Sequence, residues 1–147
     1  MNTTRIAVAK TADDIRKCFP VMRELRAHII EEDDFVKRVL GQQAQGYQLA
    51  FLEAEGSVRA VAGYRLLDSL FSGKNIYVDD LVTLAADRSH GYGGQLIDWL
   101  IDQARANRCE TLELDSGVQR FDAHRFYFSK RMSISSYHFR IKIEPEA

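Results

Sequence analysis

The sequence predicts a mixed α/β fold, in which helices pack against a sheet with both antiparallel and parallel strands. The runs 47–54 and 57–67 are rich in β-forming residues and are separated by an acidic residue and a glycine, as in an antiparallel hairpin. The runs 75–84 and 111–115 are two further strands, with an amphipathic helix at 93–107 between them. This strand–helix–strand order implies a parallel pair with a right-handed crossover. The fold class is therefore α/β or α+β with a mixed sheet.

Periodicity and capping residues define the other elements. In helix 93–107, Leu96, Ile97 and Leu100 recur at helical spacing and mark one buried face. Thr11 followed by Asp14 has the pattern of a capped helix start. The remaining expected elements, in chain order, are a strand at 5–9, a helix after Thr11, a short helix at 33–40, a loop at 68–74, a helix at 119–131 and a last strand at 134–143.

Length and composition limit the classes of protein. The 147 residues suit a single domain, 1–147, with one core. A formal net charge of −1 gives no overall field for nucleic acid or an acidic membrane, so we expect neither as a partner. The amino-terminal residues are too polar for a signal peptide, and no apolar run approaches the roughly 18 residues of a membrane span. Cys18, Cys109 and four scattered histidines lack metal-ligand spacing, so we expect no metal and a cytoplasmic protein with reduced thiols.

The most informative segment is a glycine-rich turn at 88–94, which leads into helix 93–107. A helix start presents unpaired backbone N–H groups and the positive end of the helix dipole, and both attract phosphate. Glycines let a phosphate approach the backbone, and an arginine adds a charged donor. The segment has neither the Gly-Lys-Ser/Thr ending of a P-loop nor the spacing of a dinucleotide-binding fold. By itself it fits a phosphate site or a plain tight turn almost equally well. Its residues are Arg88, Ser89, His90, Gly91, Tyr92, Gly93 and Gly94.

Arg88, Gly91 and Gly93 match the signature Q/R-x-x-G-x-G/A, and the segment resembles the GCN5-related N-acetyltransferase (GNAT) family. The resemblance implies three layers, with helices on both faces of a mixed, mostly antiparallel sheet of about six strands. It also implies that acetyl-CoA is the co-substrate, that its pyrophosphate lies on turn 88–94 and that its pantetheine arm bonds to the backbone of the preceding strand. The contacts expected on that strand are Val82 and Leu84, with Thr83 between them.

A second motif follows at 122–127, where DAHRFY resembles the A-x-x-F/L-Y helix of the same family. The two motifs together cover residues 75–132. The family's tyrosine faces the sulfur of CoA, which makes Tyr127 the expected general acid. A phenol with a pKa near 10 can protonate a departing thiolate, whose thiol has a pKa near 8.5. Without the resemblance, the simpler interpretation of Tyr127 is a core aromatic residue.

Asp79 and Asp80 are the candidates for handling the ammonium of the acceptor. Adjacent residues on a strand point to opposite faces, so we expect these two on different sides of the sheet. The family often has an acid at the position of Asp79 that orders a water. Direct proton transfer from an ammonium of pKa near 10 to a carboxylate near 3.9 costs roughly 8 kcal/mol. We therefore predict that Asp79 holds the substrate ammonium or a water chain, and we expect a structural role for Asp80.

The sequence departs from the family pattern at several places. Ser89 stands where the family usually has glycine, and Arg131-Met132 stands where the tyrosine helix usually ends in glycine and an aromatic residue. Only one strand is expected after that helix, whereas many members have two. A shortened sheet edge suggests that a second copy covers it, which makes a homodimer a possible state.

The expected acceptor is the primary amine of a small molecule. An acidic run at 31–34 could attract a polyamine or a lysine side chain, although such a run is more commonly a solvated face. The C-terminal segment is similar to aminoalkylphosphonate acetyltransferases. Two alternatives stay open: acetylation of a protein lysine or N-terminus, and a non-catalytic acyl-CoA-binding module that needs no general acid. The arginines that could bind an anionic group are Arg65, Arg120, Arg125 and Arg140.

Overall fold

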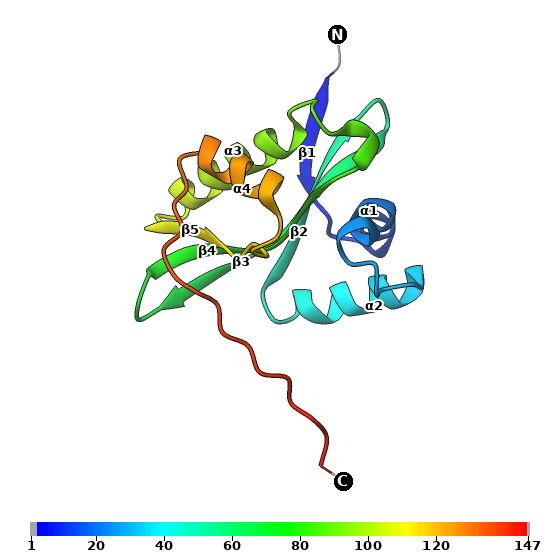
Figure 1. Cartoon of the computed structure of the whole chain (residues 1–147). Coiled ribbons are helices and arrows are strands. Elements are labelled where there is room, and N and C mark those ends of the chain that lie inside the picture. Colours follow the sequence, from blue (N-terminus) through cyan, green and yellow to red (C-terminus); the bar gives the residue numbers. More distant parts are fainter. Residues whose placement is uncertain (1–2, 147) are drawn as a thin grey trace. The chain divides into compact units, whose positions relative to one another are not determined.

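The computed structural model describes residues 3–146, which divide into two compact units (Figure 1). The first unit is Met1–Leu114 and contains the sheet and three α-helices. The second is Asp115–Ala147 and contains one α-helix and an extended segment. Each unit is described in turn.

The sheet of the first unit has five strands among the described residues, in the order β1-β2-β3-β4-β5. Neighbours are antiparallel from β1 to β4, and β5 runs parallel to β4. The crossover between these two parallel strands is the expected amphipathic helix, α3. The strands are β1 (Thr4–Val8), β2 (Tyr47–Ala54), β3 (Ser57–Ser69), β4 (Gly73–Thr83) and β5 (Thr111–Leu114). The helices are α1 (Ala12–Leu25), α2 (Glu32–Gln43), the short 3₁₀ helix η1 (Ala85–Asp87) and α3 (Tyr92–Ala106).

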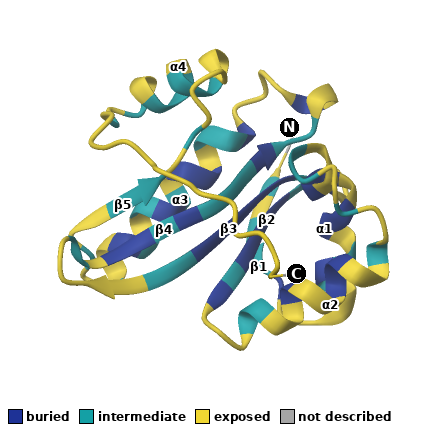
Figure 2. Ribbon diagram, turned by 60° about the horizontal axis from the view of Figure 1, so that its bottom comes forward, coloured by how far each residue is buried: buried dark blue, intermediate teal, exposed yellow. Residues whose placement is uncertain are grey.

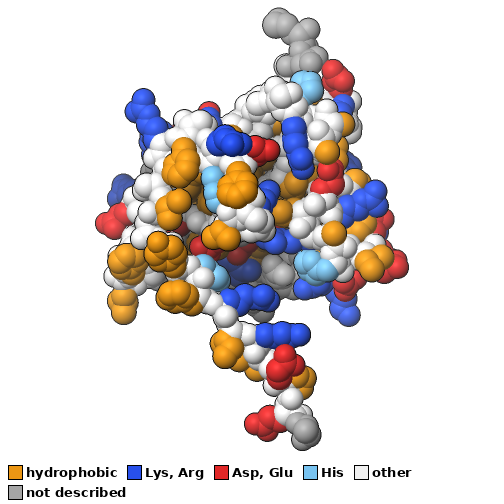
Figure 3. Space-filling model, viewed as in Figure 1, with side chains coloured by type: hydrophobic (Ala, Val, Ile, Leu, Met, Phe, Trp, Pro, Cys, Tyr) orange, Lys and Arg blue, Asp and Glu red, His pale blue; other side chains and the backbone are white. Residues whose placement is uncertain are grey.

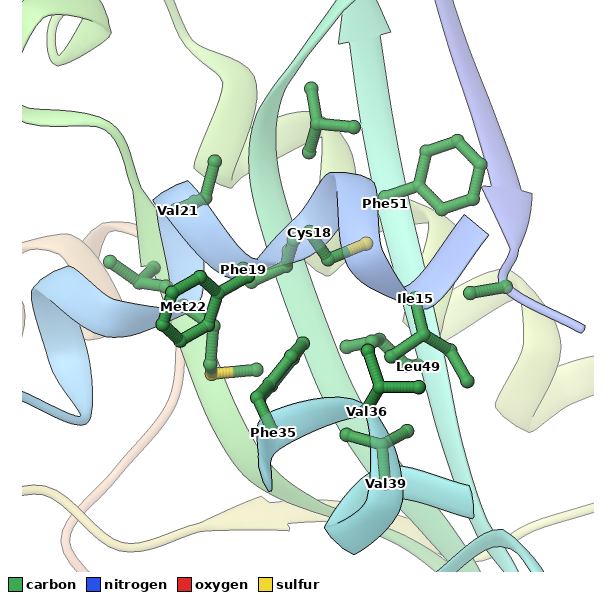
Figure 4. Packing of buried hydrophobic residues seen from close by; sticks show 14 of the residues in the cluster. Ile15, Cys18, Phe19, Val21, Met22, Phe35, Val36, Val39, Leu49 and Phe51 are labelled. Atoms are coloured by element: carbon green, nitrogen blue, oxygen red, sulfur yellow. The ribbon is translucent and has the colours of Figure 1, made fainter. Parts of the chain in front are cut away.

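Helices cover both faces of this sheet, as Figure 2 shows, so the first unit has the three expected layers. On one face, α1 and α2 pack together, and the rings of Phe19 and Phe35 lie 5.4 Å apart between their centroids (Figure 4). On the other face, α3 buries Leu96, Ile97 and Leu100 completely. Thr11 caps α1 by accepting a hydrogen bond from the amide of Asp14, as its sequence pattern predicts. The buried α1–α2 cluster includes Ile15, Cys18, Phe19, Met22, Phe35, Val36, Val39, Leu49, Phe51 and Val61.

The loop expected at 68–74 is shorter than predicted. Strand pairing continues to Asp68 opposite Lys74 and Ser69 opposite Gly73, so most of the segment belongs to β3 and β4. Gly73 has a φ of 64°, the left-handed conformation that a tight strand connection needs and that glycine adopts without strain. β3 and β4 consequently form a long hairpin.

In the second unit, α4 spans Phe121–Ser129, close to the expected helix at 119–131. The strand expected at 134–143 is not formed, because residues 132–146 make no strand pairing. The alternation that suggested it is present, but its apolar side chains are exposed, as the hydrophobic atoms along this segment in Figure 3 illustrate. A strand needs a neighbour for its backbone groups, and periodicity alone does not supply one. The exposed apolar residues of the alternation are Tyr137, Phe139, Ile141 and Ile143, each between 81% and 92% exposed.

Candidate active site

The start of α3 in the glycine-rich turn leaves backbone amides available, whereas the amides of Arg88 and His90 already donate to the carbonyls of Ala85 and Asp87. Gly91 is the N-cap of α3, with a φ of 78°, and no side chain caps the helix there. The first turn of a helix has no internal partner for its N–H groups, and this first turn carries no acidic residue that would repel an anion. Arg88 is exposed and makes no ion pair with any residue in the part of the chain that the structure describes. The arrangement can bind a phosphate through main-chain donors and one free guanidinium.

Ser89 adopts a left-handed backbone conformation, which glycine reaches without strain. Its φ is 78°, in the left-handed region, where a Cβ atom costs roughly 1–2 kcal/mol. This conformation gives a physical reason for glycine in the expected pattern, and this chain forms its turn with strain at Ser89. Arg131, at the second departure from the family pattern, likewise has a φ of 64°.

Side chains of the turn stabilise it from within. The Nδ1 atom of His90 lies 2.9 Å from the carbonyl oxygen of Asp87, and its ring stacks on Tyr92 at 5.5 Å between centroids. Asp87 is buried and lies 3.3 Å from the guanidinium of Arg59 on β3. The Tyr92 side chain is buried as well. The amide of His90 also donates to the carbonyl oxygen of Asp87, at 3.3 Å, so His90 and Tyr92 fix the turn from within. The amides that remain open to a ligand lie at the start of α3.

The outer edge of β4 is free beyond Val78. β5 pairs with β4 only from Asn75 to Val78, and no other strand of residues 3–146 pairs with β4 on that side. The amide of Leu84 donates to the carbonyl of Arg59 on β3, at 2.9 Å. Because successive amides of a strand point to alternate edges, Val82 points toward β3 like Leu84, and Thr83 points toward the free edge. Of the expected contact residues, Val82 and Leu84 therefore direct their amides toward β3, and only the amide of Thr83 between them faces the free edge.

Asp79 is the extra residue of a β-bulge. In the β3–β4 register, Gly63 lies opposite Asp80 and Tyr64 lies opposite Val78, so Asp79 has no partner. A bulge breaks the alternation of side chains along a strand. Asp79 and Asp80 consequently line the same pocket. The expectation that they lie on different sides of the sheet is wrong for this reason.

Asp80 is fully engaged by neighbouring side chains. One oxygen, Oδ1, lies 2.8 Å from Nε of Arg26, and the other accepts a 2.7 Å hydrogen bond from the hydroxyl of Tyr47. Burial and the Asp80 charge both raise the pKa of Tyr47, which keeps this phenol protonated as a donor. Gly63 makes the arrangement possible, because a Cβ atom there would lie 2.6 Å from Oδ2 of Asp80 and would overlap Tyr47. Asp80 is thus structural, as expected, and it is ion-paired rather than solvated.

Asp79 is only partly engaged. Its Oδ2 atom accepts a 2.9 Å hydrogen bond from Arg65, whose other arm is 3.4 Å from the amide oxygen of Gln42. Oδ1 of Asp79 has no hydrogen-bond partner among residues 3–146. Burial raises the pKa of Asp79, and the hydrogen bond from Arg65 acts in the opposite direction. This carboxylate can therefore accept a hydrogen bond from an ammonium or a water.

These residues surround a pocket of about 330 Å³, which we call the Asp79 pocket. Its volume lies at the lower end of the range for small-molecule sites. Of the arginines expected to bind an anion, Arg65 lines it. Its apolar wall is Met22, Ile29, Phe35 and Val39. Its polar lining is Arg26, His28, Arg38, Gln42, Tyr47, Arg65, Asp79 and Asp80.

Five of the polar lining residues were missed by reasoning from the sequence. They come from the α1–α2 connection, α2 and β2, and none lies in a motif that indicates a role. The acidic run at 31–34, which the sequence did suggest, contributes nothing to the lining. Two of its members instead pair with Arg16 on α1. The missed residues are Arg26, His28, Arg38, Gln42 and Tyr47.

Tyr127 belongs to α4 of the second unit and is half-buried. Burial raises the pKa of its phenol, and the nearby charge of Arg120 acts against that rise. The phenol therefore stays protonated at neutral pH. Arg125, another arginine expected to bind an anion, pairs with Asp122 on the same helix at 2.7 Å.

No helix within residues 3–146 is long and apolar enough to cross a membrane. In that same range, no three His, Cys, Asp or Glu side chains come together in a way that could hold a metal ion.

Comparison with known proteins gives consistent matches over nearly the whole chain. Residues 8–132 match the acetyltransferase (GNAT) family. The uncharacterized N-acetyltransferase YhdJ of Bacillus subtilis is 38% identical over 123 residues, which are 83% of this chain and 87% of that protein. The aminoalkylphosphonate N-acetyltransferase of Salmonella typhimurium is 28% identical over 136 residues, which are 88% of this chain and 84% of that protein.

Among solved structures, the fold is similar to ribosomal-protein-alanine N-acetyltransferase from Brucella melitensis. The TM-score is 0.83 with 17% sequence identity, and the match covers 97% of this chain and all of that one. A sequence identity this low is evidence for a shared fold only.

Proposed function

The chain belongs to the GNAT family of acetyltransferases, and on that premise we propose that it transfers an acetyl group from acetyl-CoA to the primary amine of a small molecule. The observation that carries the proposal is the Asp79 pocket beside a strand whose outer edge is open. We further propose direct attack within a ternary complex, in the cytoplasm. The family generally uses acetyl-CoA as co-substrate.

The turn and the free edge of β4 suit the two halves of CoA. The turn 88–94 offers unpaired amides and Arg88 for the pyrophosphate. The open edge beyond Val78 offers main-chain groups to the amide-containing pantetheine arm, as in the addition of a strand to a sheet. The amide of Thr83 is the proposed donor to the thioester oxygen, which becomes more negative during attack.

The acceptor nitrogen binds at Asp79 in this proposal. Oδ1 of that carboxylate has no partner, and burial raises its pKa, so the cost of taking a proton from an ammonium is below that for an ordinary aspartate. Asp79 holds the ammonium, whose first proton leaves through water. The neutral nitrogen then attacks the thioester carbonyl carbon and loses a second proton to water, and the carbon–sulfur bond breaks. Tyr127 donates its proton to the departing thiolate, a role that rests on the motif at 122–127, and regains a proton from water.

A small acceptor is favoured by two observations. A pocket of about 330 Å³ accommodates a molecule of a few carbons more readily than a folded peptide segment. The Salmonella relative is named for aminoalkylphosphonates, which are small primary amines. Acetylation of a protein lysine or N-terminus is the alternative.

The test is release of free thiol from acetyl-CoA in the presence of a panel of amines. The panel contains polyamines, aminoalkylphosphonates, amino acids, aminoglycosides and a lysine peptide. We expect turnover with small amines, and at least a tenfold lower kcat for Tyr127→Phe, because a general acid contributes roughly 10²–10⁴-fold. Tyr137→Phe is the matched control, since Tyr137 is 85% exposed and has no proposed role in acetyl transfer.

Other outcomes select the alternatives. Calorimetric binding of CoA without acetylation of any amine would favour a non-catalytic sensing module. Turnover with the lysine peptide alone would favour a protein acceptor. No binding of CoA at all would remove the proposed role of turn 88–94.

We also propose that two copies associate as a homodimer. In support, β5 lies at the edge of the sheet, and residues 134–143 of the same chain expose an alternating row of apolar side chains. Light scattering on the full chain and on a chain ending at Met132 should give a dimer and a monomer, respectively. A monomeric full chain would contradict this proposal.

A further inference from the structure

The Asp79 pocket carries more positive than negative side chains. Three arginines and two aspartates line it. Two of the arginines are neutralised: Arg26 pairs with Asp80 at 2.8 Å, and Arg65 pairs with Asp79 at 2.9 Å. Arg38 is the third, and it makes no hydrogen bond or ion pair with the residues at 3–146. Arg38 therefore carries the positive charge of the pocket that no aspartate neutralises.

The position of Arg38 keeps its charge unpaired. It lies on α2 one turn after Asp34 and one turn before Gln42. Asp34 is the nearest acid along that helix face, but no ion pair joins it to Arg38. An unpaired guanidinium at the wall of a small pocket can bind an anionic group of a ligand through two parallel N–H donors.

The pocket lining offers a free group of each sign. Asp79 has a free oxygen that suits an ammonium, and Arg38 has an unpaired guanidinium that suits an anion. Gln42 connects the two, because it lies about 6 Å from Arg38 between Cβ atoms and touches Arg65, which holds Asp79. A short molecule with an amine at one end and an anion at the other matches this arrangement, whereas a diamine would place its second charge beside Arg38.

We propose that Arg38 binds an anionic group of the acceptor, so that the substrate class is a small amine that bears a carboxylate, phosphonate or phosphate. This inference rests on the proposed acetyl transfer and on Asp79 as the ammonium site. Arg38 is a specificity-determining residue: it selects the acceptor and takes no part in the chemistry at the thioester.

The test uses amines of similar length that differ in the second group: propylamine, β-alanine, 2-aminoethylphosphonate and 1,4-diaminobutane. Free-thiol release from acetyl-CoA gives kcat/KM for each. We expect the two anionic amines to exceed propylamine at least tenfold, and the diamine to be the poorest substrate. The ratio of β-alanine to 2-aminoethylphosphonate then tells which anion is preferred.

The variant Arg38→Gln should lower kcat/KM for the preferred anionic amine about 10- to 100-fold, the range for loss of a hydrogen bond between charged groups. It should leave propylamine within twofold. Lys37→Gln removes the same charge from the neighbouring, exposed position, which does not line the pocket, and it should change neither value. Arg38 is exposed, so its replacement should not impair folding, and thermal melting checks this.

Equal losses for all amines in Arg38→Gln, or a preference for propylamine or the diamine, would overturn the inference while acetyl transfer stands. If no amine is acetylated, the proposed function fails first. Calorimetric binding of 2-aminoethylphosphonate in the presence of CoA then still tests Arg38. Binding by the wild type that Arg38→Gln weakens at least tenfold supports the inference, and absent or unaltered binding overturns it.

Discussion

The turn at 88–94 and the Asp79 pocket are built in opposite ways. The turn consists of seven consecutive residues and offers mainly backbone amides, with Arg88 as its one free cation among the residues described. The pocket is lined by side chains from α1, α2, β2, β3 and β4 and from the connection between α1 and α2. A backbone site depends on local conformation, so a short motif can specify it. A side-chain site depends on which elements the fold brings together, and no short motif encodes that.

This difference suggests that the two regions have separate functions. In our proposal, the turn and the free edge of β4 bind acetyl-CoA, the general co-substrate of the family. The pocket can change residue by residue without disturbing the turn, and we propose that it selects the acceptor. Replacements in the two regions should therefore affect different kinetic constants.

The largest effect is expected at Asp79. Asp79→Asn removes the charge that holds the ammonium, so kcat/KM for the acceptor should fall about 100-fold, from roughly 3 kcal/mol for a hydrogen bond between charged groups. Binding of CoA measured by calorimetry should be unchanged. Asp68→Asn, an exposed position on the same hairpin, is the control.

The same carboxylate gives a pH dependence with a defined sign. Only its anionic form holds an ammonium, and burial raises its pKa above the ordinary value of 3.8. In the wild type, kcat/KM should decline as the pH falls through that raised pKa, and Asp79→Asn should lack this decline. If kcat/KM of Asp79→Asn still declines at low pH, the titrating group is a residue other than Asp79.

A smaller effect, on the free energy of unfolding and on KM for the acceptor, is expected at Gly63. A methyl group there would overlap Tyr47 and lie 2.6 Å from Asp80. Gly63→Ala should therefore lower the free energy of unfolding by about 1–3 kcal/mol, the usual cost of overpacking, and raise KM for the acceptor. Urea denaturation measures the first quantity. Gly41→Ala is the control, because a methyl group at that helical position has no atom within 4 Å. Unchanged stability in Gly63→Ala would contradict the tight packing around Asp80.

The smallest effect is expected in the turn. Ser89→Gly relieves a left-handed residue with a φ of 78°, and it also makes the unfolded chain more flexible, so the net gain in unfolding free energy should be about 0.5–1 kcal/mol. Thermal denaturation at matched scan rates can detect this. Ser57→Gly at the start of β3, where φ is not positive, should destabilise instead. A destabilised Ser89→Gly would mean that the serine side chain contributes to the turn.

Much of the fold followed from local sequence patterns, and its exceptions have physical causes. Helix α3 and the hairpin were predictable because their periodicities are strong and short-range. The last strand was not, since residues 134–143 have the right alternation but no neighbouring strand in the structure. Asp79 and Asp80 were placed on opposite faces because a bulge adds one residue to a strand without any clear signal in the sequence.

In the candidate site, too, features encoded by local sequence were predictable and features that depend on the fold were not. The turn was located by its glycines and arginine, and Ser89 was correctly singled out as the unusual position. Arg38 and Tyr47 were not predictable, because each is an ordinary residue on an element whose neighbours only the fold determines. The roles of Tyr127 and Asp79 stay proposals until kinetics test them.

The most direct test of the account is steady-state kinetics with both substrates varied, for the wild type, Arg88→Gln and Arg38→Gln, with acetyl-CoA and 2-aminoethylphosphonate. The account predicts that Arg88→Gln raises KM for acetyl-CoA about tenfold and leaves KM for the amine unchanged, and that Arg38→Gln does the reverse. Absence of turnover, or parallel changes of both constants in both variants, would contradict the division of this site into a co-substrate turn and an acceptor pocket.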